Sequence, residues 1–157
     1  MTTRKLYAYP SSGPANLAQA TMDYFGVEYE YVETHPLKDT KTEEYLKINP
    51  YGKIPAMTEG DFNLYESLAI ARYVCRINES TPFYPLDNPQ KAAEIDAVID
   101  YCVLTFRKGL ENYSYEMCFG PFLQGIDLPT ETRKEELQKE VDDACAGIVD
   151  ILNRSGG

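Results

Sequence analysis

Long apolar runs are missing from this 157-residue sequence, and no stretch approaches the roughly 20 residues that span a membrane. Its first ten residues, MTTRKLYAYP, meet charge and proline before a signal-peptide core could form. Basic residues are scarce: 15 Lys and Arg stand against 25 Asp and Glu, a formal net charge of −10. A field of that sign repels phosphate backbones and anionic lipids. We therefore expect no nucleic acid and no membrane among its partners.

Cysteine and histidine are also few. The four cysteines are widely spaced and form no C-x-x-C pair, which is typical of reduced thiols in a cytoplasmic protein rather than of a disulfide framework. A chain of this length can bury an adequate core without cross-links, so we expect no metal site. The single histidine, His35, lies beside Pro36 in a polar stretch, and we expect it to carry no chemistry.

The amino-terminal half alternates between strand and helix patterns. Lys5–Tyr9 is short and aromatic, which predicts a strand, and apolar residues at helical spacing predict a helix over Pro14–Phe25. Val27–Val32 alternates with period two, which predicts a second strand and completes a β-α-β unit. Residues 34–52 read as a mainly polar connection with one short helical piece near Thr42–Leu46.

A hairpin and a third helix follow. Lys53–Thr58 and Phe62–Tyr65 flank a glycine-containing turn, which predicts two antiparallel strands, and Leu68–Cys75 is rich in helix formers. Turn formers and prolines then cluster over residues 78–88. We therefore predict a β-α-β, β-β-α domain over residues 1–78 and a linker over residues 79–88.

Residues 89–157 carry no strand signal. A long helix is predicted from Pro89 until Gly120-Pro121 stops it, and a last helix from about Thr130 or Thr132 to Asn153. Thr132-x-x-Glu135 resembles a capping box. This part is therefore a partial all-helical domain, a helical hairpin whose apolar stripes need a further partner.

Three short motifs carry chemistry, and the first is the Ser12 turn. Ser11, Ser12 and Gly13 lie between the first strand and the first helix, where helix N–H groups favour an anion and a hydroxyl can donate a hydrogen bond. Plain helix capping by a serine is the alternative interpretation.

The second motif is Lys53-Ile54-Pro55-Ala56, in which proline stands at the mouth of a strand. A cis Ile54–Pro55 bond would turn the Ile54 backbone outward, free to pair with an extended peptide-like ligand. A trans proline at the start of the strand is the alternative.

The third motif is Glu66-Ser67 at the start of the third helix. A carboxylate can bind an ammonium group there, while the hydroxyl and the helix amides bind a carboxylate, so the pair fits an amino acid. Plain capping is again the alternative.

Together, Ser12-Gly13-Pro14, Asn49-Pro50-Tyr51-Gly52-Lys53-Ile54-Pro55-Ala56 and Tyr65-Glu66-Ser67-Leu68-Ala69-Ile70 resemble the glutathione S-transferase family, and its theta class in particular. The resemblance implies an α/β thioredoxin-like amino-terminal domain plus a short all-α carboxyl-terminal domain. It also implies glutathione as co-substrate, a small electrophile as second substrate, a detoxification role, a homodimer and no metal.

Carried over residue by residue, the resemblance makes Ser12 the hydrogen-bond donor to the glutathione sulfur. Ile54, with Pro55 after it, would present its backbone to the cysteinyl unit, Lys53 would meet the glycyl carboxylate, and Glu66 with Ser67 would hold the γ-glutamyl group. Two rival sulfur donors stay open, Ser11 and Tyr9.

Two residues of the long helix are further candidates for the site. By the same resemblance, Arg107 could present its charge toward the sulfur; a solvated helix charge is its alternative. Tyr113 could line the electrophile pocket, although an apolar helical stripe is usually core.

Family members usually continue for several more helices than this sequence has. The resemblance therefore leaves two functions open: a glutathione transferase that activates the thiolate for attack on small electrophiles, or a non-catalytic module of the same fold that binds other proteins.

Overall fold

The computed structural model describes residues 3–79 and 83–155, and residues 80–82 of the predicted linker lie outside the described residues. The chain forms two compact units, Met1–Pro89 and Gln90–Gly157. We call them unit 1 and unit 2 and describe each by itself. No helix within the described ranges is both long and apolar enough to cross a membrane.

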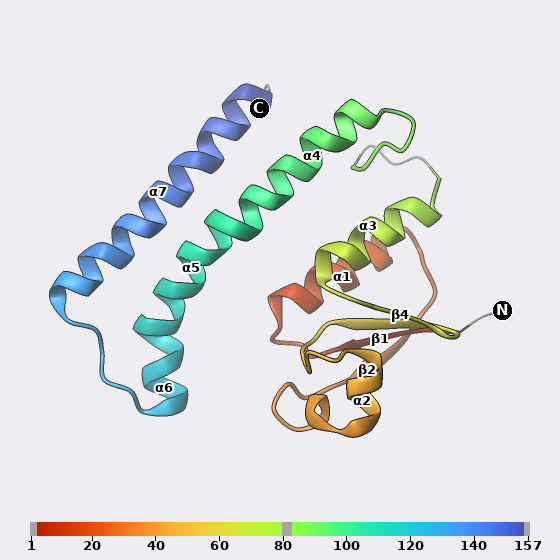
Figure 1. Cartoon of the computed structure of the whole chain (residues 1–157), viewed down its shortest axis with the longest axis horizontal. Coiled ribbons are helices and arrows are strands. Elements are labelled where there is room, and N and C mark those ends of the chain that lie inside the picture. Colours follow the sequence, from red (N-terminus) through yellow and green to blue (C-terminus); the bar gives the residue numbers. More distant parts are fainter. Residues whose placement is uncertain (1–2, 80–82, 156–157) are drawn as a thin grey trace. The chain divides into compact units, whose positions relative to one another are not determined.

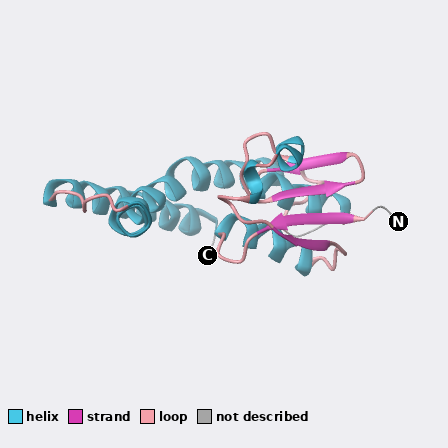
Figure 2. Cartoon of the chain, turned by 90° about the horizontal axis from the view of Figure 1, so that it is seen from below, coloured by secondary structure: helices cyan, strands magenta, loops and turns pink. Residues whose placement is uncertain are grey.

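Unit 1 is a four-stranded mixed sheet with helices on both faces (Figure 1). Its elements are β1 (Arg4–Ala8), α1 (Gly13–Tyr24), β2 (Glu30–Glu33), the 3-10 helix η1 (Asp39–Lys41), α2 (Glu43–Ile48), β3 (Ala56–Glu59), β4 (Phe62–Tyr65) and α3 (Ser67–Ile77). The strand order is β2-β1-β3-β4; β1 pairs parallel with β2, and β3 pairs antiparallel with β1 and β4 (Figure 2). The predicted β-α-β, β-β-α order is confirmed.

The core of unit 1 lies between the sheet and helices α1 and α3. Side chains alternate along β1, so Leu6 and Ala8 point into this core while Tyr7 points to the opposite face. There the Tyr7 ring packs edge-on against Tyr45 of α2, with ring centres 5.8 Å apart. The buried cluster comprises Leu6, Ala8, Ala15, Ala18, Met22, Met57, Ile70 and Val74.

Two strands begin later than the sequence predicts. After α1 the chain turns at Gly26, whose φ is +63°, and the Val27 N–H donates to the Met22 carbonyl. Val27 and Tyr29 therefore pack beside the core instead of starting β2. β3 begins at Ala56 because the Lys53 carbonyl accepts hydrogen bonds from side chains of the α2 region rather than from a neighbouring strand.

Unit 2 consists of one long, interrupted helix and a second helix beside it (Figure 1). The first comprises α4 (Pro89–Tyr101), the π-helical segment η2 (Cys102–Phe106), α5 (Arg107–Ser114), the π-helical segment η3 (Tyr115–Phe119) and α6 (Gly120–Gln124). The second is α7 (Glu131–Ser155).

The predicted stop at Gly120-Pro121 is wrong, because the helix continues to Gln124. The π turn of η3 changes the hydrogen-bond partners just before Pro121, which then lies in the first turn of α6, where a missing N–H costs little. Gly125 ends the helix instead, with φ at +65° and its N–H donating to the Pro121 carbonyl.

The start of α7 agrees with the first of the two predicted starts, Thr130. Thr130 accepts a hydrogen bond at its hydroxyl from the Arg133 N–H, at 3.3 Å. The Thr130 carbonyl accepts from the Lys134 N–H as well. Thr130 is therefore the capping residue, and the suggested Thr132–Glu135 capping box is wrong because α7 begins one residue before Thr132.

Packing between the long interrupted helix and α7 combines two small residues with a polar cluster. A side chain at Gly109 would stand 3.0 Å from the Glu140 carbonyl, and one at Gly147 would overlap the Tyr101 hydroxyl. Beside them, Arg133 donates to three carboxylates of the two helices, and Asn112 donates to one of these. We call this cluster the clasp; its members are Asn112, Glu116, Arg133, Glu136 and Glu140.

Candidate functional site

Strand register brings the three motifs to one end of the sheet. Tyr7 near the end of β1 pairs with Ala56 at the start of β3, and Ala56 pairs with Tyr65 at the end of β4. The chain leaves β1 toward Ser12 and leaves β4 toward Glu66, while Ile54 leads into β3. All three predicted motifs of unit 1 therefore lie at the same end of the sheet.

Ser12 is the N-cap of α1. Its backbone is extended, with φ −91° and ψ 107°, and its Oγ accepts a hydrogen bond from the Ala15 N–H at 3.3 Å. A hydroxyl that accepts in this way keeps its own proton for another acceptor. Capping and donation are therefore compatible here, and the Ser12 proton can be given to an anion at the positive end of α1.

The two rival donors lie in different surroundings. Ser11 is exposed in the turn before α1. Tyr9 is half-buried, and its ring packs edge-on against His35 with 5.2 Å between ring centres. The Nδ1 atom of His35 accepts a hydrogen bond from the Leu37 N–H.

The Ile54–Pro55 peptide bond is cis, which confirms that prediction. The ladder between β1 and β3 ends at the Tyr7–Ala56 pair, so the Ile54 backbone lies beyond it. Pro55 is buried, Ile54 is half-buried, and the Lys53 side chain is exposed. This segment thus offers a backbone edge and an ammonium group.

Glu66 and Ser67 open α3 with an unusual backbone. The φ of Glu66 is +69°, a conformation that costs a residue with a side chain on the order of 1–3 kcal/mol. Its carbonyl accepts the Ile70 N–H at 3.0 Å, and its carboxylate is exposed. Ser67, the first residue of α3, is 7% exposed. The pair therefore combines a solvent-facing carboxylate with the amide end of a helix.

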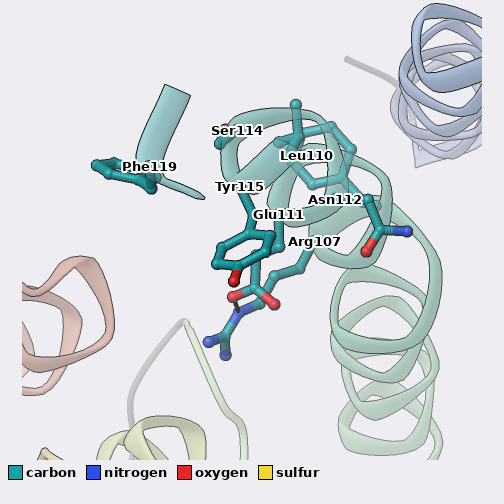
Figure 3. A pocket seen from close by; sticks show the side chains of 8 residues that line it. Arg107, Leu110, Glu111, Asn112, Ser114, Tyr115 and Phe119 are labelled. Carbon is teal, nitrogen blue, oxygen red and sulfur yellow. Dashed lines mark hydrogen bonds and ion pairs between the residues drawn. The ribbon is translucent and has the colours of Figure 1, made fainter. Parts of the chain in front are cut away.

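A groove of about 650 Å³ runs along α5 in unit 2 (Figure 3). It includes the candidate Arg107, whose guanidinium pairs with Glu111 one turn on. Figure 3 shows both side chains with the Tyr115 ring, which lines the same groove. Tyr113, half-buried on α5, is not among the described lining residues, which are Phe106, Arg107, Leu110, Glu111, Asn112, Ser114, Tyr115 and Phe119.

The aromatic part of this groove was not predicted from the sequence. Tyr115 and Phe119 stand at the two ends of η3, and Phe106 ends η2. The apolar stripe that predicts this helix includes Phe106 but continues through Tyr113 and Met117, not through Tyr115 and Phe119. Such a stripe also does not distinguish a groove from a core.

Comparison with known proteins decides the family. Residues 2–76 match the model of the glutathione S-transferase amino-terminal domain. The chain belongs to the glutathione S-transferase family. Over 155 residues it is 29% identical to a probable glutathione S-transferase GSTF1 of Oryza sativa subsp. japonica, covering 97% of this chain and 67% of that protein. Over 94 residues it is 35% identical to a zeta class glutathione S-transferase of Euphorbia esula, covering 59% of this chain and 42% of that protein.

A solved structure agrees. The glutathione transferase BmGSTD1 of Bombyx mori superimposes with a TM-score of 0.83 at 25% identity, covering 98% of this chain and 67% of that one. The fold is thus that of the family, a thioredoxin-like unit followed by an all-helical part. The chain spans 42% to 67% of the length of these three proteins. Relatives of the zeta class and others support the family without confirming a theta class.

Proposed function

We propose that this chain is a glutathione transferase: unit 1 binds glutathione and activates its thiol for attack on small electrophiles. The observation that carries the proposal is the state of Ser12, a helix cap whose hydroxyl accepts from Ala15 and keeps its proton to donate. It lies at the sheet edge that also holds Ile54 and Glu66. An extended, anionic tripeptide with a free ammonium group matches these donors and charges.

Ser12 acts in this proposal as a donor and not as a base, because a serine hydroxyl does not ionise usefully near neutral pH. A hydrogen bond to the thiolate favours the charged form of sulfur and lowers the thiol pKa. Lowering that pKa by two units requires about 2.7 kcal/mol of differential stabilisation. One charge-assisted hydrogen bond and the amino end of α1 can supply it. The resemblance to the theta class therefore means, in chemical terms, that a serine and not a tyrosine donates the hydrogen bond to sulfur.

The remaining motif residues are matched to the groups of glutathione by their charge. Lys53 would pair with the glycyl carboxylate, and the Ile54 backbone with the cysteinyl unit. Glu66 would pair with the γ-glutamyl ammonium group, and Ser67 with the carboxylate beside it. The exposed ends of Lys53 and Glu66, which form no ion pair within the described residues, support this assignment.

The groove on α5 supports the proposal that the second substrate is a small apolar electrophile. Its volume lies within the range of small-molecule sites, and its lining joins aromatic rings with one arginine–glutamate pair. The thiolate forms a bond from sulfur to an electrophilic carbon while a leaving group departs or the electron pair of a double bond accepts a proton. Detoxification of such compounds is the role we propose.

Cell location and assembly belong to the same proposal. The four cysteines, Cys75, Cys102, Cys118 and Cys145, are free thiols, which supports a reducing cytoplasm. We propose a homodimer; light scattering at micromolar concentration gives its mass.

Replacing Ser12 tests the mechanism. Ser12→Ala should raise the pKa of the bound glutathione thiol by at least one unit and lower kcat toward an aryl halide about tenfold, because the thiolate loses its donor. Thiolate absorbance across a pH titration measures the pKa. Ser11→Ala, which changes the adjacent exposed hydroxyl, is the matched control and should leave both quantities unchanged. An unchanged thiol pKa in Ser12→Ala would remove Ser12 from the mechanism.

Glutathione affinity and turnover together test the function. The wild-type chain should be retained on immobilised glutathione and should consume the aryl halide. Retention without turnover would select the protein-binding module instead, and absence of glutathione binding would reject the transferase.

A further inference from the structure

The Lys53 carbonyl is held by two side-chain donors from the α2 region. The Tyr45 hydroxyl donates to it at 2.7 Å, and the Asn49 side-chain amide donates to the same oxygen, also at 2.7 Å. A carbonyl oxygen has two lone pairs, so both are used. We call Tyr45 and Asn49 the carbonyl clamp.

Both members of the clamp are themselves fixed. Tyr45 is 5% exposed, and its ring packs against Tyr7 of β1. Asn49 is 3% exposed, and its Oδ1 accepts the Tyr51 N–H at 3.0 Å. Burial raises the pKa of the Tyr45 hydroxyl far above its ordinary value, so this group stays a donor at every pH the protein meets.

The adjoining residue, Gly52, is locked as well. Its carbonyl accepts a hydrogen bond from the Lys41 ammonium at 3.0 Å. Its φ is +57°, and a side chain there would stand 2.9 Å from the Thr40 carbonyl. The chain therefore enters Lys53 with little freedom to rotate.

Fixing the Lys53 carbonyl fixes the Ile54 N–H, because the two belong to one planar peptide group. This peptide bond is trans, since Ile54–Pro55 is the only cis bond in the described chain. In a trans peptide the carbonyl and the N–H point in opposite directions. Two hydrogen bonds to the carbonyl also polarise the peptide group and strengthen its N–H as a donor.

From this geometry we propose that Tyr45 and Asn49 are positioning residues for glutathione: they aim the Ile54 N–H at the cysteinyl backbone of the bound tripeptide. This rests on the proposed function. The clamp touches neither the sulfur nor the electrophile, so it acts on binding and leaves the reacting thiol unchanged. An interaction made equally in the ground state and the transition state changes KM and not kcat.

Tyr45→Phe is the sharpest variant. It removes one donor while the ring stays against Tyr7 and Asn49 still satisfies the Lys53 carbonyl, so the variant is expected to fold. Tyr7→Phe is the matched control, because it removes a hydroxyl from the other ring of the same pair. We expect Tyr45→Phe to raise the glutathione Kd and KM about three- to tenfold, the cost of one hydrogen bond. Tyr7→Phe should stay within about twofold, by the same scale.

Three readouts separate positioning from general loosening. In Tyr45→Phe, kcat at saturating glutathione and the pKa of the bound thiol should match the wild type, and the Ile54 amide nitrogen resonance of the ligand-free protein should shift. Calorimetry, steady-state kinetics and NMR measure these. A fall in kcat equal to the rise in KM, or an unmoved Ile54 resonance, would overturn the positioning role.

Failure of the two proposals can be told apart. A wild-type chain that does not bind glutathione rejects the proposed function and this inference together. A wild-type chain that binds glutathione no better than Tyr45→Phe rejects the inference alone.

Discussion

The two units bury their apolar side chains to very different extents. In unit 1, eight apolar residues form one continuous buried cluster between the sheet and two helices. In the described part of unit 2, Leu137 and Ala144 are the only buried apolar side chains. Other apolar side chains of unit 2 are largely exposed: Phe122 is 86% exposed and Leu104 is 71% exposed.

Different forces therefore hold the two units. Unit 1 derives its stability from apolar area removed from water, at about 25 cal/mol per Å². Unit 2 depends more on close helix approach at Gly109 and Gly147 and on the ion pairs of the clasp. A helical hairpin with few buried side chains has a smaller free energy of opening than a unit with a continuous core, so we expect unit 2 to open more easily.

The largest expected effect comes from truncating the core of unit 1. Leu6→Ala should lower the free energy of unfolding of unit 1 by about 2–5 kcal/mol, because it leaves a cavity in a fully buried cluster. Leu110→Ala on the partly exposed groove of unit 2 is the comparison and should cost well under half as much. Amide hydrogen exchange resolved by segment measures both. Equal losses would show that the units are not stabilised differently.

A smaller effect should follow from adding one methyl group between α4 and α7. Gly147→Ala places a carbon where the Tyr101 hydroxyl stands, so the Tyr101 ring must move and give up its hydrogen bond to the Ala144 carbonyl. We expect a loss of about 1–3 kcal/mol, confined to unit 2. Ala146→Ser, on the exposed side of α7, is the control. Faster exchange in α4 and α7 with unit 1 unchanged is the expected result; unaltered exchange in α7 would contradict it.

The smallest expected effect is acid loosening of the clasp. Hydrogen bonds from Arg133 hold the pKa of the Glu116 carboxyl below its ordinary value, and those from Asn112 and Arg133 do the same for Glu140. A carboxyl whose pKa is lowered by folding stabilises the fold above its unfolded pKa and loses that contribution as pH falls through the folded value. The protection of amides in α5 and α7, relative to their intrinsic exchange rate at each pH, should therefore fall below about pH 4.5, near the unfolded pKa.

A single substitution checks the source of that acid effect. Arg133→Met should flatten the pH dependence of unit 2, because both carboxyls then titrate nearer their ordinary pKa. Among the described residues of unit 1, Glu59 is the comparable carboxyl, and its pKa is lowered by its hydrogen bonds from Arg4 and Tyr73. Because the apolar core of unit 1 does not titrate, unit 1 should open at a lower pH than unit 2. Simultaneous opening would contradict the contrast.

The secondary structure of unit 1 could be predicted because its strands and helices each follow from a short sequence pattern. The alternation around Leu6 and Ala8 identifies a strand with one buried face, and Gly13-Pro14 identifies a helix start. The order of elements and the cis Ile54–Pro55 bond were predicted correctly. The late start of β3 was not, because it depends on Tyr45 and Asn49 reaching a carbonyl several residues along the chain.

Unit 2 was harder to predict for a physical reason. Helical spacing predicts that a helix forms, but not where its hydrogen-bond ladder widens, so η2, η3 and the continuation past Pro121 were missed. At the candidate site, the motifs gave Ser12, Lys53, Ile54, Glu66 and Ser67 as a set. Their placement at one sheet edge follows from the register of β1, β3 and β4.

The π turns let the interrupted helix hold extra residues without turning its side chains to a new face. In a regular helix each residue advances the side-chain direction by about 100°, whereas a π turn closes over one more residue than an α turn. Deleting one residue from Cys102–Phe106 and restoring an ordinary ladder would therefore leave Leu110 and Tyr115 facing nearly the same way. Deleting one residue from the regular helix α4 would instead turn the groove by about 100° relative to the start of that helix. The direction of the groove thus tolerates a change of length inside a π turn and not beside it.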